Sequence, residues 1–193
     1  MRGRGEGGRE SYFGRELETD IFGKPKFATE YSAALKRYAR DSKNGFLPYE
    51  VAQQLIREFY LDDPTDPSKE FAKDLRLEVC ERFELDDDEA DAVKFYSAVG
   101  TPLDLFHGVD AWMEIDLGDD RRGRFHVEVT LDATLNASKL REGHKADVIV
   151  GDVPAPDSKD YLDWVNRSAE EIYELLSSRL RNEITRRGGA QAK

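Results

Sequence analysis

The chain has 193 residues, of which 39% are hydrophobic and 36% are charged, and its formal net charge is −11. That length suits one domain with a substantial core, and no apolar run approaches the roughly 20 residues that a membrane helix needs. The acidic balance argues against a protein that coats nucleic acid nonspecifically, because phosphate binding depends on Lys and Arg. It does not exclude a nucleic-acid enzyme that carries a local basic patch.

The tail sequences and the single cysteine favour a cytoplasmic protein. The first ten residues are rich in Gly and Arg and lack the apolar region of a secretory signal. Cys80 is the only cysteine, which fits a reducing compartment, and we expect it to be a buried side chain in a helix. We expect a single domain over residues 11–187, with disordered tails at 1–10 and 188–193.

The first half of the chain, to about residue 100, predicts helices. Apolar side chains at helical spacing mark three of them, at about 28–40, 48–60 and 68–83. Pro48 suits the first turn of the second helix, and Ser68 suits the N-cap of the third. Asp86, followed three residues later by Glu89, resembles a capping box and predicts a fourth helix that ends at Gly100.

The period changes in the segment over 101–150. Residues 108–117 and 124–133 both alternate between apolar and polar side chains, and a polar loop over 118–123 separates them. This pattern predicts a β-hairpin. A short helix over 136–142, a buried strand over 145–150 and a long amphipathic helix over about 158–186 follow. We therefore expect an α/β fold, with a small mixed sheet of the hairpin plus a further strand, flanked by helices.

One face of the predicted hairpin carries Asp110, Glu128, Thr130 and Asp132. Neighbouring carboxylates repel each other, and Mg²⁺ offsets this repulsion because it takes oxygen ligands. Such an ion activates water for attack on a phosphodiester. The hairpin places Asp110 opposite Thr130 or Asp132, and the sequence leaves open whether Glu128 or Asp132 is its closer partner. A hairpin with one face in water would show the same alternation without any function.

These residues resemble a known family. The segment GTPLDLFHGVDAW carries an acidic residue shortly before Gly-Val-Asp, and FHVEVT is similar to a strand that carries Glu-x-Lys. With the helix and strand that follow, residues 86–150 resemble the core of the PD-(D/E)XK nuclease superfamily, the restriction-endonuclease-like proteins. The resemblance implies a nuclease that uses Mg²⁺ or Mn²⁺ to hydrolyse phosphodiester bonds in DNA or RNA.

The resemblance also implies roles for individual residues. The implied metal ligands are Asp110, Glu128, the backbone carbonyl of Val129 and, as a further acid, Asp104. Thr130 stands where the family has its catalytic lysine, and Lys139 from the following helix is the candidate replacement. The candidate catalytic set is therefore Asp110, Glu128, Thr130 and Lys139.

Other side chains of this segment have two interpretations each. Arg121, Arg122 and Arg124 at the hairpin tip are candidate phosphate contacts or an ordinary solvated turn. Trp112 shares the face of Asp110 and is a candidate for stacking on a base, although packing is the commoner role of a strand Trp. His107 or His126 is a candidate general base near the metal ion, whereas the histidine spacing matches no common zinc pattern.

The sequence thus favours a metal-dependent nuclease whose partner is nucleic acid. The alternative is a nuclease-like fold that no longer cleaves and acts as a protein- or nucleic-acid-interaction module. Thr130 at the lysine position and the net charge of −11 suit that alternative. The apolar side of the final helix could pack on the sheet or on a second chain, so a homodimer is also open.

Overall fold

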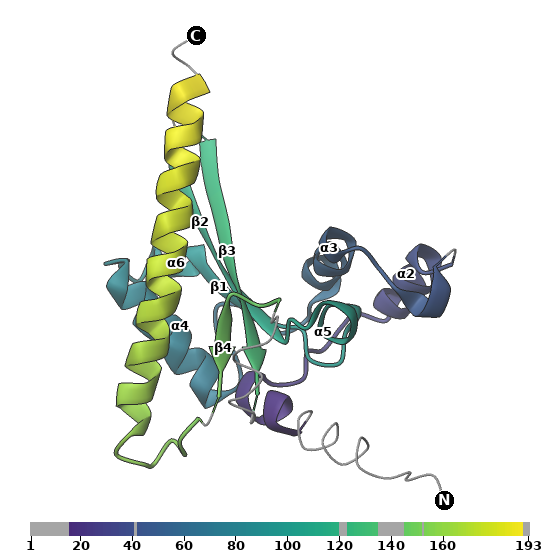
Figure 1. Ribbon diagram of the computed structural model, residues 1–193, viewed down its shortest axis with the longest axis horizontal. Coiled ribbons are helices and arrows are strands. Elements are labelled where there is room, and N and C mark those ends of the chain that lie inside the picture. The colour runs from purple at the N-terminus through teal and green to yellow at the C-terminus, as the bar shows by residue number, and fades with distance from the viewer. Residues whose placement is uncertain (1–15, 41, 120–122, 135–144, 152, 191–193) are drawn as a thin grey trace, which may run out of the picture.

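The computed structural model describes residues 16–40, 42–119, 123–134, 145–151 and 153–190. They form a four-stranded sheet between two groups of helices (Figure 1), which confirms the α/β class. A helix over residues 16–22 comes first. The elements after it are α2 (Glu30–Tyr38), η1 (Lys43–Gly45), α3 (Tyr49–Phe59), α4 (Glu70–Arg82), η2 (Ala90–Ala92), β1 (Val93–Ser97), α5 (Pro102–His107), β2 (Ala111–Asp119), β3 (Gly123–Ala133), β4 (Val148–Val150) and α6 (Tyr161–Ala190). Within the described part of the chain, no helix has both the length and the apolar character that crossing a membrane requires.

The sheet is mixed, with the strands in the order β1-β2-β3-β4. β1 pairs with β2 and β2 with β3 in antiparallel fashion, while β4 joins the edge of β3 in parallel. The register of the hairpin pairs Ala111 with Leu131, Trp112 with Thr130 and Glu114 with Glu128. A parallel neighbour requires a crossover connection, and the predicted helix over 136–142 lies in that connection, outside the described residues.

One face of the sheet packs against α4 and α6 and forms the larger core. Alternate hairpin residues point into it, among them Met113, Ile115, Val129 and Leu131, which are fully buried. Leu176 of α6 meets them from the helix side. The period of two in the strands and the helical period of α6 thus bring apolar side chains together, and removing this area from water stabilises the fold.

The opposite face packs against a smaller apolar cluster from α2, α3 and α5. Trp112 of β2 is fully buried in this cluster and stacks on Tyr96 of β1, with ring centroids 4.8 Å apart. Leu55 of α3 and Leu103 of α5 belong to the same cluster. Trp112 therefore has a packing role, and its buried ring presents no face on which a base could stack.

Most of the predicted elements are confirmed, but the fourth helix is wrong. A turn follows Asp86, Ala90–Ala92 is the short 3-10 helix η2, and Val93–Ser97 is strand β1. The Asp86 side chain does cap a turn, because it accepts hydrogen bonds from the backbone N–H groups of Asp88 and Glu89 at 3.0 and 3.1 Å. The chain then turns to strand because Val93 and Phe95 enter the core and β2 provides the backbone partners.

Two boundary predictions also differ from the structure. Ser68 is not the N-cap of α4, because that helix begins after Lys69 and has no side-chain cap bond. At the other end of the chain, α6 continues to Ala190, beyond the predicted start of the tail at residue 188. The predicted N-terminal tail over 1–10 lies outside the described residues.

Candidate metal centre

The hairpin register separates the two acids that the sequence favoured as a pair. Glu128 lies opposite Glu114, four residues along β2 from Asp110. Four strand residues span about 13 Å, so Asp110 and Glu128 share a face of the sheet without sharing a site. Instead, Asp110 stands beside Asp132, because its backbone N–H donates to the Leu131 carbonyl at 2.9 Å and the Ala133 N–H donates to its Oδ2 at 2.8 Å.

Asp110 belongs to a group of three carboxylates. One ligand atom each from Glu18, Asp104 and Asp110 lies within 4.8 Å of the other two. Glu18 comes from the helix over residues 16–22, Asp104 from α5, and Asp110 from the residue before β2. Segments far apart in the sequence therefore converge on one point at the end of the sheet where β2 begins.

The local sequence fixes the short helix that carries Asp104. Thr101 caps α5 by accepting a hydrogen bond from the Leu103 N–H at 3.2 Å, and Pro102 occupies the first turn, where a missing N–H costs nothing. Gly108 ends the helix in the left-handed region at φ 64°. The Asp104 carboxylate accepts from the Gly100 N–H at 2.7 Å, which holds it on the side of the helix where Asp110 lies.

The surroundings of Asp110 disfavour the ionised form of its carboxyl group. Its residue is only 2% exposed, and burial, together with the nearby charges of Glu18, Asp104 and Asp132, raises its pKa to about 9. The hydrogen bond from the Ala133 N–H acts against this rise. An ionised Asp110 is thus costly in this setting unless a positive charge accompanies it.

The donor set of this group fits a hard divalent cation. All three ligand atoms are carboxylate oxygens, which Mg²⁺ and Mn²⁺ take in proteins. A bound dication would offset both the burial of Asp110 and the repulsion between the acids. Glu18 was missed by the sequence analysis, because its place beside Asp110 depends on tertiary packing that no local pattern signals.

Glu128, the second predicted metal ligand, is held by helix α3 instead. Three residues on one face of that helix, each four apart, contact its carboxylate. The Tyr49 hydroxyl donates at 3.3 Å, the Gln53 amide at 2.7 Å and the Arg57 guanidinium at 2.8 Å. Burial alone would raise the pKa of Glu128, but hydrogen bonds and the charge of Arg57 lower it below its usual value. The carboxylate is therefore ionised and already satisfied by protein donors.

A second trio of ligand atoms surrounds Glu128, but it does not fit a metal ion. Glu114, His126 and Glu128 each offer an atom within 4.8 Å of the others. Arg57 donates to Glu114 at 2.7 Å and to Glu128 at 2.8 Å, so its cation stands where an ion would have to bind. We call these residues, Arg57, Glu114, His126 and Glu128, the Arg57 cluster.

The two candidate histidines have different surroundings. His126 belongs to the Arg57 cluster, where its Nε2 atom is 3.8 Å from Glu128, and the carboxylate of Glu128 raises the pKa of His126 against the effect of burial. His107 lies at the end of α5, where its Nε2 atom is 2.8 Å from the Leu47 carbonyl oxygen. Neither histidine belongs to the trio around Asp110.

Thr130, at the predicted lysine position, joins β3 to the segment before β4. Its hydroxyl donates to Asp147 Oδ2 at 2.7 Å and accepts from the Asp147 N–H at 2.9 Å. Arg179 of α6 donates to the same carboxylate and to the Glu128 carbonyl. The side chain of Val129 lies in the core. Val129 is next to Glu128 in β3, so its backbone carbonyl lies in the part of the hairpin near Glu128 and not beside Asp110. The Glu-Val-Thr segment thus carries contacts that stabilise the fold.

The remaining predicted site residues cannot be placed. Lys139, Arg121 and Arg122 lie outside the described residues, and so does the side chain of Arg124, although its backbone is part of β3. Their roles as charge-stabilising or phosphate-binding groups stay predictions.

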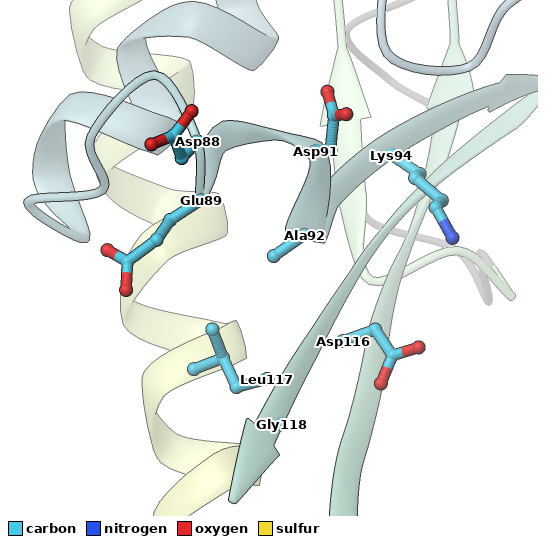
Figure 2. Close-up of a pocket in the computed structure, with 8 residues that line it drawn as sticks. All are labelled: Asp88, Glu89, Asp91, Ala92, Lys94, Asp116, Leu117 and Gly118. Carbon is cyan, nitrogen blue, oxygen red and sulfur yellow. The ribbon is translucent and has the colours of Figure 1, made fainter.

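An acidic pocket elsewhere lacks the convergence seen around Asp110. It has a volume of about 300 Å³ and lies between the turn before β1 and the far part of β2. In Figure 2 the carboxylates of Asp88, Glu89 and Asp116 point in different directions, and Lys94 also lines the pocket. Dispersed carboxylates beside a lysine do not form a metal site.

Comparisons with protein-family models, curated proteins and solved structures found no match to this chain. The assignment of a function therefore depends on the site itself.

Proposed function

We propose that the protein is a metal-dependent nuclease in which Glu18, Asp104 and Asp110 hold a Mg²⁺ or Mn²⁺ ion. The observation that carries this proposal is the burial of Asp110 within 4.8 Å of two further carboxylates, at the start of β2. Two of these acids, Asp104 and Asp110, lie in the segment whose resemblance to the PD-(D/E)XK superfamily implied a metal site. The order of strands and the parallel β4 are compatible with that resemblance.

The bound ion would polarise a phosphate oxygen and lower the pKa of a coordinated water. Asp110 anchors the site, because its Oδ2 atom is held by the Ala133 N–H and its backbone by Leu131. We assign to Asp132, which lies across the hairpin from Asp110, the role of orienting a water or accepting its proton. Asp132 thus replaces Glu128 in the proposed site, and Lys139 stays the candidate for stabilising the charge that develops on the phosphate.

A cleavage assay with matched variants tests this proposal. Single- and double-stranded DNA and RNA are incubated with MgCl₂, MnCl₂ or EDTA, using the wild type, Asp110→Asn, Asp132→Asn and the surface control Asp160→Asn. We expect metal-dependent cleavage that both site variants lose and the control keeps. Absence of cleavage from every substrate, together with no Mn²⁺ binding by calorimetry, would refute the proposal.

The alternative, an interaction module that does not cleave, has one specific observation in its favour. Thr130 occupies the position of the family's lysine and is committed to Asp147. Nucleic-acid binding without cleavage, unchanged in Asp110→Asn, is the result that would support this alternative.

A further inference from the structure

We propose that one side of α5 and the turn before α3 bind single-stranded nucleic acid, which we assign as the substrate class. The surface consists of Phe46, Leu105, Phe106 and Lys145, and we call it the α5 surface. The inference deepens the proposed nuclease function and, as an account of the substrate, rests on it.

The first observation is that packing leaves large apolar side chains of this surface uncovered. Phe46 is 45% exposed and Leu105 is 57% exposed. The ring of Phe106 supports Phe46 edge-on, with centroids 5.7 Å apart and an interplanar angle of 69°. The imidazole of His107 also contacts the ring of Phe46, with centroids 5.5 Å apart and an interplanar angle of 47°. Phe46 is thus a braced aromatic ring that is open to solvent.

The second observation is that this surface and the candidate metal centre share the short helix α5. Leu105 directly follows Asp104, which is one of the three clustered carboxylates. The helix α5 has only six residues, about 9 Å in length. Asp104 and Phe106 are two residues apart and so point to opposite sides of this helix. A strand bound at Phe46 therefore passes around α5, a path of roughly 10 Å, to reach the carboxylates.

The third observation is a cation at the same place in an acidic protein. Lys145 is exposed, and its ammonium group donates to the Phe106 carbonyl oxygen at 3.1 Å. The ammonium lies at the backbone of Phe106, whose ring contacts Phe46, and single strands use a cation and an aromatic ring together, with phosphate on the cation and base on the aromatic face. The net charge of −11 makes a local contact of this kind more suitable than a long basic track.

The geometry favours an unpaired strand over the other occupants. Bases of a duplex are stacked inside it and cannot reach a side-chain ring, whereas unpaired bases are free to stack on one. A second copy of the chain would need roughly 800 Å² of surface per partner for a stable interface. Three large side chains and a lysine form a patch well below that size.

Fluorescence anisotropy tests the α5 surface separately from catalysis. The probes are a fluorescein-labelled oligothymidylate of about 12 nucleotides and a duplex of the same length, both in EDTA so that no strand is cut. We expect the single strand to bind more tightly, Phe46→Ala to weaken that binding about tenfold and Phe46→Trp to retain it. Lys145→Gln should reduce the salt dependence of the binding constant by about 0.7 in slope.

The control is Leu162→Ala, which removes an exposed apolar side chain of α6. Equal affinities of Phe46→Ala and Leu162→Ala, or a duplex bound as tightly as the single strand, would overturn the inference. A dimer in light scattering that Phe46→Ala dissociates would overturn it too, with a second copy as the occupant. If Asp110→Asn loses cleavage and Phe46→Ala binds the single strand as the wild type does, the nuclease proposal is supported and the α5 surface is refuted. If Phe46→Ala binds more weakly but the wild type cleaves no substrate, the α5 surface is supported and the nuclease proposal is refuted.

Discussion

Asp110 and Glu128 lie on the same face of the β2–β3 hairpin, yet Glu128 pairs with Glu114, four residues further along β2 than Asp110. This separation divides the polar face into two regions with opposite electrostatics. Around Asp110, carboxylates gather and burial raises its pKa. Around Glu128, donors from α3 satisfy the carboxylate and lower its pKa below the usual value despite burial. The first region offers carboxylate oxygens as metal ligands, whereas in the second a guanidinium already contacts the acids.

Asp110→Asn should abolish metal-dependent cleavage and at the same time stabilise the metal-free protein. The amide retains an oxygen that accepts from the Ala133 N–H, and it removes the cost of protonating this acid, whose pKa rises to about 9 on folding. We expect the free energy of unfolding to rise by on the order of 2 kcal/mol at neutral pH, measured by urea denaturation in EDTA. A destabilised variant would mean that the acidic group at Asp110 is not under strain.

Glu128→Gln should keep cleavage but loosen the contact between α3 and the hairpin. An amide cannot form the ion pair with Arg57 and accepts fewer hydrogen bonds from Gln53 and Tyr49. A loss of about 1–3 kcal/mol in the free energy of unfolding is expected, and the exposed Glu50→Gln on the same helix serves as the control. Complete loss of cleavage in a folded Glu128→Gln would return Glu128 to the metal site.

The difference between these two acids shows what the sequence could and could not predict. Alternation located the hairpin and placed Asp110 and Glu128 on one face, since a period of two is a local property. The register decided between Glu128 and Asp132, and it depends on the exact pairing across the loop. The roles of Glu18 and Arg57 depend on helices that reach the sheet only in the folded chain. The sequence did not predict strand β1, because the capping pattern at Asp86 and Glu89 indicates the start of a helix that would continue to Gly100.

The Arg57 cluster should make stability depend on pH. Glu128, with its folded pKa lowered, contributes stability above its unfolded pKa of about 4.5, and the contribution is lost as pH falls through the folded value. His126, with its folded pKa raised chiefly by Glu128, contributes below its unfolded pKa of about 6.5, and the contribution is lost as pH rises through the folded value. Both contributions are therefore fully present together only between these two unfolded pKa values, and each declines beyond them.

The change in the free energy of unfolding between about pH 5.5 and pH 8, measured by urea denaturation, has a part from His126 and a part from Asp110, whose raised pKa acts over the same range. The part from His126 is the difference in this change between the wild type and His126→Ala. Because this side chain is 45% exposed and faces Arg57 as well as Glu114 and Glu128, we expect a difference of only about 0.5 kcal/mol. His126→Ala should remove that part of the pH dependence. An unchanged profile in this variant would show that His126 does not titrate with the cluster.

Thr130→Val should destabilise the junction of β3, β4 and α6 without affecting the metal centre. The substitution keeps the shape of the side chain but removes both hydroxyl bonds with Asp147. We expect a cost of about 1–2 kcal/mol, measured by urea denaturation beside Thr65→Val, whose hydroxyl bonds the exposed Asp63. If Thr130→Val folds but loses cleavage, the hydroxyl of Thr130 takes part in catalysis and its role is not only to bind Asp147.

Arg57→Ala should both destabilise the protein and create a metal site. Glu114 and Glu128 face each other across the hairpin, and without the guanidinium their charges are left unpaired, at a cost of about 3 kcal/mol. The vacated space is then bounded by two carboxylates and His126, a donor set that Zn²⁺ accepts. Zinc at a hundredfold excess over its dissociation constant would restore about 2.7 kcal/mol.

The measurement is the melting temperature with and without ZnCl₂, for the wild type, Arg57→Ala and Arg57→Ala combined with His126→Ala. The carboxylates around Asp110 are common to all three proteins and can give each of them a zinc-dependent rise. A larger rise is expected in the single variant, because only there are all three donors of the Arg57 cluster present and the guanidinium absent. An equal rise in the wild type would show that zinc binds elsewhere, since Arg57 occupies this position in the native protein. A melting temperature of Arg57→Ala that zinc leaves unchanged would mean that the three donors are too rigidly held, or too far apart, to share an ion.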